Sequence, residues 1–227
     1  MDKIKLQAGL LAIGASLMCA NTMAMSNSAM SNSGGNLLIF EGGLSYSHAN
    51  YKGSFTPAES HTPITPAGFS IHPSDFYPNN FWGGYIGLSL YVPAGWLINT
   101  RYDSYGSESK TNSAAGTTIS FAPARFAFTA DKVGGCIDEF SYGLGAGAVF
   151  ESTNKGDATI VLSGDNPLSE SIAGRTRIDP MVEGFLMYRF NNNVGIKLNA
   201  AYQLAINNDA SKGDLNLNLG INYALPI

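Results

Sequence analysis

The stretch that decides the fold is the last one in the chain, GDLNLNLGINYALPI, residues 213–227. From Leu215 to Ile227 every second residue is apolar, and the residues between them are mainly Asn and Gly. A strict period of two predicts a β-strand with one apolar face and one polar face. In a soluble sheet the apolar face packs inward, whereas in a membrane barrel it faces lipid and the polar face lines the interior. The rest of the chain decides between these two arrangements.

The composition excludes some classes of protein. Charged residues make up only 13% of the 227 residues, about half the share found in soluble domains. The formal net charge is -4, whereas a nucleic-acid-binding domain normally carries a basic patch. We therefore expect no nucleic-acid partner, and the length suits one compact barrel with generous loops.

Residues 1–24 have the features of a secretory signal peptide. Two lysines precede an apolar run over residues 10–20, and small residues follow up to Ala24, where cleavage is expected. The run is shorter than the roughly 20 residues of a membrane-spanning helix. A lipoprotein signal is the alternative and would modify Cys19, but Met18 stands where a small residue is needed.

Two further regions follow the signal peptide. Residues 25–36 repeat Met, Ser and Asn and have too little apolar surface to fold, so we expect a flexible Ser/Asn-rich leader. Residues 37–227 form the barrel domain. Cys136 is the one cysteine left after cleavage, so no intramolecular disulfide can form.

Eight segments of the barrel domain show the period-two pattern, and each has about the length of a tilted membrane strand. The links between them alternate between short turns and long polar loops, which is typical of bacterial outer-membrane barrels. The sequence therefore predicts an all-β fold: a closed antiparallel eight-stranded transmembrane β-barrel with short periplasmic turns and long extracellular loops. The expected strands are 37–46, 82–92, 96–105, 118–129, 138–150, 181–190, 194–206 and 214–225.

Two of these regions are irregular. In 118–129 the residues Ile119 and Phe121 have the opposite parity to Phe126 and Phe128, and the intervening proline predicts a bulge that changes the register. The loop 151–180 contains TIVLSG and SESIAG, which are expected to form a hairpin beyond the membrane. That hairpin would raise the strand count to ten if it entered the barrel.

The charged residues of the strands all lie on the polar face, at about one per strand. A water-facing surface would be roughly 25 to 35% charged, so we expect this face to line a narrow interior and the apolar face to contact lipid. Buried charges are costly unless they are paired, and the set should form a network that plugs the lumen. A gate or an ion path is the alternative role. The expected members are Glu41, Arg101, Asp103, Arg125, Glu139, Glu183, Arg189 and Lys197.

Within this network, two contacts are expected from the positions along the strands. Glu139 should lie beside Arg189 near the periplasmic end, and Glu41 should reach Arg101 or Arg125 across the filled interior. The glycines of GLGAGA, residues 143–148, should leave space for opposing side chains. That motif lies inside a strand with no following helix, so it is not a nucleotide-binding loop.

Aromatic residues gather at the two ends of the apolar faces, where membrane proteins place their interfacial girdles. If the first strand rises from the periplasm, Phe126 and Phe128 also belong to the periplasmic girdle. The periplasmic girdle is expected to contain Trp96, Phe140, Tyr142, Tyr188, Phe190 and Tyr223, and the outer girdle Tyr46, Trp82, Tyr102 and Phe150.

This pattern resembles the small eight-stranded outer-membrane barrels, namely the OmpA transmembrane domain, OmpX, OmpW and the opacity-type proteins. The resemblance covers residues 37–227 and rests on the pattern, not on a diagnostic motif. It implies a monomer in a Gram-negative outer membrane, surrounded by outer-membrane lipid and lipopolysaccharide and inserted by the barrel-assembly machinery. Such chains usually end in an aromatic residue, whereas this one ends in Ile227.

Three functions remain open at this point. The first is a non-enzymatic surface protein that supports the envelope or binds an extracellular ligand through loops 47–81 and 151–180. The second is a narrow porin-like channel for small solutes. The third is a lipid-modifying enzyme in which His48 would act with Asp103 and Ser104, but no motif supports it and we expect no enzymatic activity.

Metal and cofactor sites are not expected either. The three histidines, His48, His61 and His72, are spaced too widely for a compact ligand pattern.

Overall fold

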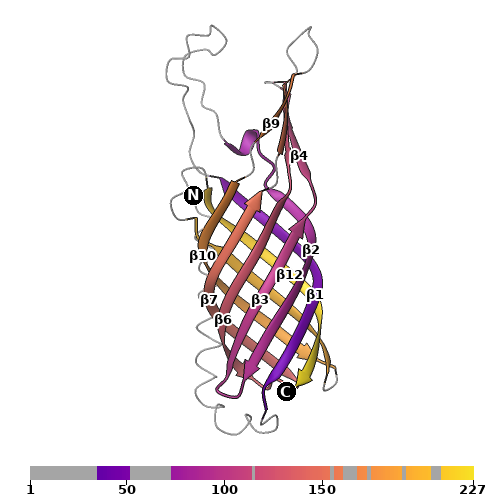
Figure 1. Ribbon diagram of the computed structural model, residues 1–227, viewed down its shortest axis with the longest axis vertical. Coiled ribbons are helices and arrows are strands. Elements are labelled where there is room, and N and C mark those ends of the chain that lie inside the picture. The colour runs from indigo at the N-terminus through magenta and orange to yellow at the C-terminus, as the bar shows by residue number, and fades with distance from the viewer. Residues whose placement is uncertain are drawn as a thin grey trace, which may run out of the picture.

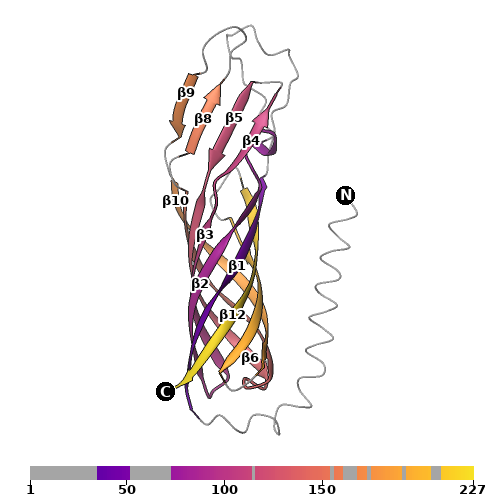
Figure 2. The same cartoon turned by 90° about the vertical axis from the view of Figure 1, so that its right-hand side faces the viewer.

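The described residues form a closed barrel with a small sheet above one end (Figures 1 and 2). The computed structural model describes residues 35–51, 73–113, 116–153, 156–160, 168–172, 175–190, 193–205 and 211–227. The expected signal peptide, nearly all of the leader, His61 and His72 lie outside these residues. Within the described ranges, no helix has the length and apolar character needed to cross a membrane.

Eight long strands make the barrel, in the order β1-β12-β11-β10-β7-β6-β3-β2. All neighbours are antiparallel, and β1 closes the ring by pairing with β12, with Leu37 opposite Pro226. This confirms the predicted fold class. The strands are β1 (Leu37–Tyr51), β2 (Asn80–Val92), β3 (Trp96–Tyr105), β6 (Pro123–Gly135), β7 (Phe140–Thr153), β10 (Arg175–Arg189), β11 (Val194–Gln203) and β12 (Ser211–Pro226).

The two ends of the barrel differ in their connections. The short links join β2 to β3, β6 to β7 and β10 to β11, and they lie at the same end as the start of β1 and the end of β12 (Figure 1). We call this the turn end. Gly95 and Gly135 have φ of 74° and 81° there, a conformation that glycine adopts without steric cost. The opposite end carries the long connections and is called the loop end.

A four-stranded sheet, the loop-end sheet, stands above the loop end (Figure 2). It has the order β4-β5-β8-β9, and a short 3-10 helix, η1 (Pro73–Asp75), belongs to the connection between β1 and β2. The β8–β9 pair is the hairpin expected in 151–180, and because it stays outside the barrel the strand count is eight. The strands of the loop-end sheet are β4 (Glu108–Asn112), β5 (Thr117–Phe121), β8 (Gly156–Ile160) and β9 (Leu168–Ile172).

The segment 118–129 differs from its expected form. It is not one bulged strand, because β5 ends at Phe121 in the loop-end sheet and β6 begins at Pro123 in the barrel. The parity change therefore marks the passage from one sheet to the other. As a result Phe126 lies opposite Tyr102 and Phe150, towards the loop end, so Phe126 and its neighbour Phe128 do not belong to the periplasmic girdle.

The residues 131–135 were expected as a turn but continue β6. Asp131 is buried in the interior, and Lys132 lies on the outside. The Lys132 ammonium donates to the carbonyl oxygen of Ala94 at 2.7 Å and lies 5.3 Å from the centre of the Trp96 ring. A long lysine can thus stay on a lipid-facing strand near its end, because its charged group reaches the interface.

The burial pattern of β12 answers the question raised by the C-terminal stretch. Leu219 and Ile221 are 53% and 65% exposed, whereas Asn218 and Asn222 are each 1% exposed. Apolar side chains therefore point outward and polar side chains inward, the inverse of a soluble sheet.

The ten aromatic residues expected in the girdles all lie on outward positions of the barrel strands or directly after one, near one end or the other. On β2, Trp82 lies towards the loop end and Val92, opposite Trp96, at the turn end. Ten residues of strand rise about 34 Å, which at a tilt of about 40° gives about 26 Å along the barrel axis. This separation is close to the apolar band of about 25 Å in outer-membrane barrels.

Candidate functional site

The interior of the barrel is the candidate functional site, and side chains from all eight barrel strands line it in layers. The layer nearest the turn end is apolar and is called the turn-end plug. It packs side chains from β1, β2, β3, β6, β10 and β12 with one from the β6–β7 turn. Its members are Leu37, Ile39, Tyr91, Leu97, Val133, Ile137, Phe185, Met187 and Ala224.

A glycine on β7 makes room for the plug. A Cβ atom at Gly143 would overlap the ring of Phe185 on neighbouring β10. The glycine therefore allows a large aromatic side chain to lie across a narrow interior, as expected for GLGAGA. Lys197 adds a cation–π contact, with its ammonium 5.0 Å from the centre of the same ring.

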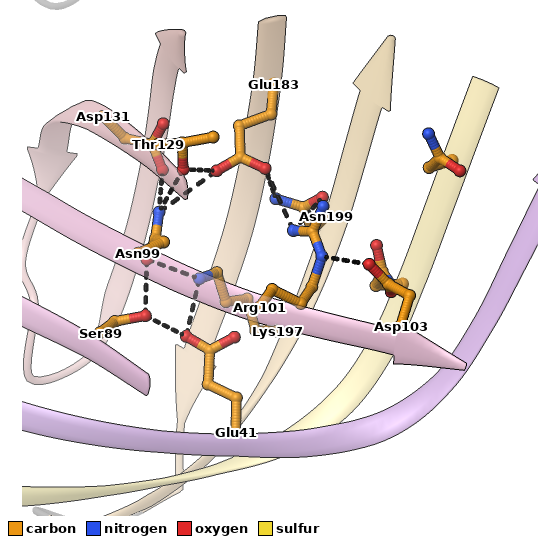
Figure 3. Close-up of polar contacts among 12 residues, drawn as sticks. Glu41, Ser89, Asn99, Arg101, Asp103, Thr129, Asp131, Glu183, Lys197 and Asn199 are labelled. Atoms are coloured by element: carbon orange, nitrogen blue, oxygen red, sulfur yellow. Dashed lines mark hydrogen bonds and ion pairs between the residues drawn. The ribbon is translucent and has the colours of Figure 1, made fainter. Parts of the chain in front are cut away.

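The second layer is a set of charged and amide side chains that we call the middle network (Figure 3). Lys197 on β11 donates to Glu41 Oε1 on β1 at 2.7 Å. Arg101 on β3 contacts Glu183 Oε2 on β10 at 3.1 Å and Asp103 Oδ2 at 3.2 Å. These contacts include ion pairs between strands on different walls of the barrel. Further members are Ser89, Asn99, Thr129, Asp131 and Asn199.

Neutral side chains link these ion pairs. Ser89 donates to Glu41 Oε1 at 2.8 Å, and Asn199 donates to Glu183 Oε2 at 3.0 Å. Asn218 on β12 donates to Asp103 Oδ1 at 2.6 Å. The three carboxylates of these ion pairs thus each also accept a hydrogen bond from a neutral donor, which offsets the cost of removing a charge from water.

The third layer, the loop-end network, is built around two arginines. Arg125 on β6 contacts Glu151 Oε2 at 2.6 Å and Asp214 Oδ2 at 2.8 Å. Arg177 on β10 contacts the same two carboxylates and also Asp179 Oδ2 at 3.2 Å. Both guanidinium groups therefore share their acids, which fixes β6, β7, β10 and β12 to one another.

Aromatic residues cover the loop-end network. Tyr105 and Phe81 are buried, and the Arg125 guanidinium lies 5.3 Å from the centre of the Tyr105 ring. Phe121 of the loop-end sheet packs against Phe81, with ring centres 5.2 Å apart. The loop-end sheet is thus continuous with the packing of the barrel interior.

The structure places most of the expected charge network inside the lumen. Five members lie in the middle network and one in the loop-end network. Arg189 lies at the turn end, where it contacts Asp138 at 3.1 Å. The middle members are Glu41, Arg101, Asp103, Glu183 and Lys197, and the loop-end member is Arg125.

Two expectations about the ionic partners in this network were wrong. Glu139 is exposed in the turn between β6 and β7, because β7 begins at Phe140 and the expected strand began two residues earlier. Glu139 does lie beside Arg189, because its carbonyl oxygen accepts a hydrogen bond from the Arg189 backbone N–H at 2.7 Å. The ion pair with the Arg189 guanidinium, however, is formed by Asp138. Glu41 pairs with Lys197 and not with Arg101 or Arg125, because β1 and β11 are separated only by β12 in the closed ring.

Sequence reasoning missed five charged members of the lumen. Four of them fall in segments expected as links, because polar residues at a strand end look like a loop, and Asp214 stands at the first residue of an expected strand. Parity was the signal that could have found them, as Glu151 continues the inward row of Val149. The five are Asp131, Glu151, Arg177, Asp179 and Asp214.

The structure does not bring His48, Asp103 and Ser104 together as a catalytic set. Successive strand residues point to opposite faces, and Asp103 is buried inside while Ser104 is exposed outside. His48 Nδ1 lies 2.8 Å from Asn80 Oδ1. Among the described residues, no three histidine, cysteine or acidic side chains are placed to hold a metal ion.

Comparison with known proteins identifies the fold. No protein-family model and no curated protein sequence matches the chain. OprG, an outer membrane protein of Pseudomonas aeruginosa, is similar over 88% of this chain and 100% of its own, with 12% identity and a TM-score of 0.55. Ail, the attachment invasion locus protein of Yersinia pestis, is similar over 84% of this chain and 99% of its own, with 16% identity and a TM-score of 0.50.

A third structure is a major outer membrane protein of Thermus thermophilus. It is similar over 83% of this chain and 99% of its own, with 10% identity and a TM-score of 0.50. At these identities the likeness is one of fold. It confirms the resemblance to small outer-membrane barrels.

Proposed function

We propose that the protein is a monomeric outer-membrane barrel that acts without catalysis at the cell surface, where it contacts a ligand or supports the envelope. The observation that carries this proposal is the contrast between a filled lumen and a sheet built above it. The barrel interior is occupied by the turn-end plug and two ion-pair networks, whereas the loop-end sheet extends strand structure beyond the loop end of the barrel (Figure 2).

The outer surface of the barrel supports a membrane location. Large apolar side chains are exposed on every barrel strand, including Phe40 and Leu44 on β1, so the apolar belt is complete. A soluble protein rarely exposes so large an apolar surface. Export by a cleaved signal peptide, insertion by the barrel-assembly machinery and contact with lipopolysaccharide belong to the same proposal. The turn end would then face the periplasm and the loop end the exterior.

The loops 47–81 and 151–180 are the proposed ligand contacts. The second of these loops contributes β8 and β9 to the loop-end sheet. In the first, the carbonyl oxygen of Ser74 accepts a hydrogen bond from Lys110 of β4, and this contact ties the loop-end sheet to η1. Loops held on a rigid scaffold are the usual place for recognition in a barrel.

Two measurements test the location and orientation. Membrane fractionation followed by electrophoresis with and without boiling should give an outer-membrane band whose mobility changes on heating. An epitope tag in the β8–β9 link should bind antibody on intact cells. The matched control carries the tag in the β2–β3 turn, Pro93–Gly95, and should bind antibody only after the envelope is permeabilised. The reverse result would overturn the orientation, and a soluble periplasmic band would overturn the barrel location.

A narrow channel is the second candidate, and the polar character of two of the three lumen layers favours it. An eight-stranded barrel has space for little more than its own side chains, so the wild type should show little or no conductance in planar bilayers. Glu41→Ala or Arg101→Ala should raise the conductance in a salt-dependent way, because each leaves a charge that attracts water. Large, steady wild-type channels would favour the channel over the closed barrel.

A further inference from the structure

The middle network contains more acids than bases, and this surplus points to a further ligand. Arg101 contacts Asp103 and Glu183, and Lys197 contacts Glu41. Asp131 forms no ion pair within the part of the chain that the structure describes. Two cations therefore face four carboxyl groups, which are Glu41, Asp103, Asp131 and Glu183.

Asp131 is poorly placed to be a carboxylate. It is 0% exposed, and its Oδ2 accepts a hydrogen bond from the Asn99 amide. Its Oδ1 is buried and has no hydrogen-bond partner among the described residues. This oxygen lies against Gly145 of β7, in the space where a Cβ atom would overlap it. An ionised Asp131 would leave a buried charge outside any ion pair of the described residues and with one oxygen unsatisfied, which is strongly unfavourable.

A second acid converges on the same donors (Figure 3). The Asn99 Nδ2 atom that contacts Asp131 also lies 3.2 Å from Glu183 Oε1. Thr129, two residues before Asp131 on the same face of β6, donates its hydroxyl to Glu183 Oε1. Two buried carboxyl groups that share one amide group strongly disfavour being ionised together.

We propose that the pair formed by Asp131 and Glu183 binds one proton in the folded barrel, and that Asp131 carries it. Glu183 remains a carboxylate because Arg101 and Asn199 both donate to its Oε2. The proton neutralises the acid that forms no ion pair among the described residues, and it makes the charge of the lumen depend on pH. This inference requires only the filled barrel and is independent of the proposed surface role.

The surroundings of Asp131 favour a proton over a metal ion. The groups nearest to the two carboxyls are hydrogen-bond donors, the Asn99 amide and the Thr129 hydroxyl, whereas a metal ion needs several oxygen ligands. The charged groups that face the pair are Glu41 on β1, Arg101 and Asp103 on β3, and Lys197 on β11. The facing residue of β7 is Gly145, which has no charge.

The test uses Asp131→Asn, because an asparagine side chain has the shape and neutral charge of a protonated aspartate. Unfolding in urea is followed by the mobility difference of folded and unfolded protein over a range of pH. As pH rises above about 4, where an unfolded aspartate ionises, the unfolded state releases a proton that the folded state keeps. The unfolding equilibrium constant of the wild type should therefore increase about tenfold per pH unit relative to the variant.

A matched control and a spectroscopic readout complete the experiment. Glu139→Gln changes an exposed turn carboxyl and should keep the pH dependence of the wild type. The infrared spectrum of the folded wild type near neutral pH should contain the carbonyl band of a protonated carboxyl group, and Asp131→Asn should lack it. This band of the wild type tests directly whether the folded barrel contains a protonated carboxyl group, even if the variant does not fold. The proposal would be overturned if the unfolding equilibrium constants of the wild type and Asp131→Asn changed in parallel with pH, or if the folded wild type lacked the band.

Discussion

The turn-end plug and the loop-end network close the same barrel by opposite means. In the plug, apolar side chains such as Leu97 and Ile39 fill the lumen without needing a particular partner. In the loop-end network, Arg125 and Arg177 hold the same acids in a fixed geometry. Apolar contacts are non-directional, whereas a buried charge depends on every one of its partners. The two regions should therefore respond differently to the loss of one side chain.

The largest effect is expected for Arg125→Ala. Glu151 and Asp214 would lose an ion pair each, and Arg177 alone would face both. Breaking a buried ion pair by removing one partner costs about 3–5 kcal/mol in the free energy of unfolding. Urea titrations of the purified barrel in detergent measure this loss, and Lys132→Ala on the outer surface is the matched control for removing a cation. A loss equal to that of the control would contradict the network.

The next largest effect is expected for Leu97→Ala in the turn-end plug. Leu97 is fully buried, and truncation of a buried leucine costs about 2–5 kcal/mol through lost burial and the cavity that remains. The same titrations, repeated at several salt concentrations, should give a constant loss because no charge is involved. A loss that varies strongly with salt would show that the plug is hydrated.

A smaller effect is expected for Gly143→Ala. The added methyl group would overlap the Phe185 ring, and overpacking of this kind typically costs about 1–3 kcal/mol. The double variant Gly143→Ala with Phe185→Leu should recover part of the loss, since the smaller side chain gives way. If the double variant is instead less stable by the full sum of the two single losses, the two positions are not in contact.

The smallest effect is expected when both partners of one ion pair become apolar. Glu41→Leu combined with Lys197→Met removes the contact across β1 and β11 without leaving a charge behind. Replacing a whole buried pair is often neutral, so the free energy of unfolding should change by no more than about 1 kcal/mol. Each single change should cost more than the double one, which a double-mutant cycle measures directly.

The fold could be predicted because its signals are local. Alternation in stretches such as 213–227 reports the two faces of each strand, and the absence of charge on the apolar face separates lipid from water. The β8–β9 hairpin of the loop-end sheet was expected, but β4 was missed, because a short polar strand has no apolar alternation to report. The placement of Asp131 was missed because Asp-Lys-Val-Gly-Gly has the composition of a turn.

The charge network was only partly predictable for a different reason. Parity places a residue inside or outside the barrel, but it does not give the partner. The contact between Glu41 and Lys197 exists because β12 inserts between β1 and β11 when the ring closes. Similarly, whether the carboxylate of Asp138 or that of Glu139 pairs with the Arg189 guanidinium depends on the residue at which β7 begins. Both contacts depend on how the strands are placed relative to one another, which a single sequence does not encode locally.

The seam between β1 and β12 has a consequence for the rate of folding. It joins the first and last strands of the barrel, with Tyr51 opposite Ser211 and Leu37 opposite Pro226. Contacts this distant in sequence form slowly, because a long loop must close before they contribute. Until β12 arrives, β1 presents an unpaired edge to any other strand in the envelope. Ring closure therefore competes with aggregation until β12 pairs with β1, and this pairing removes both edges at once.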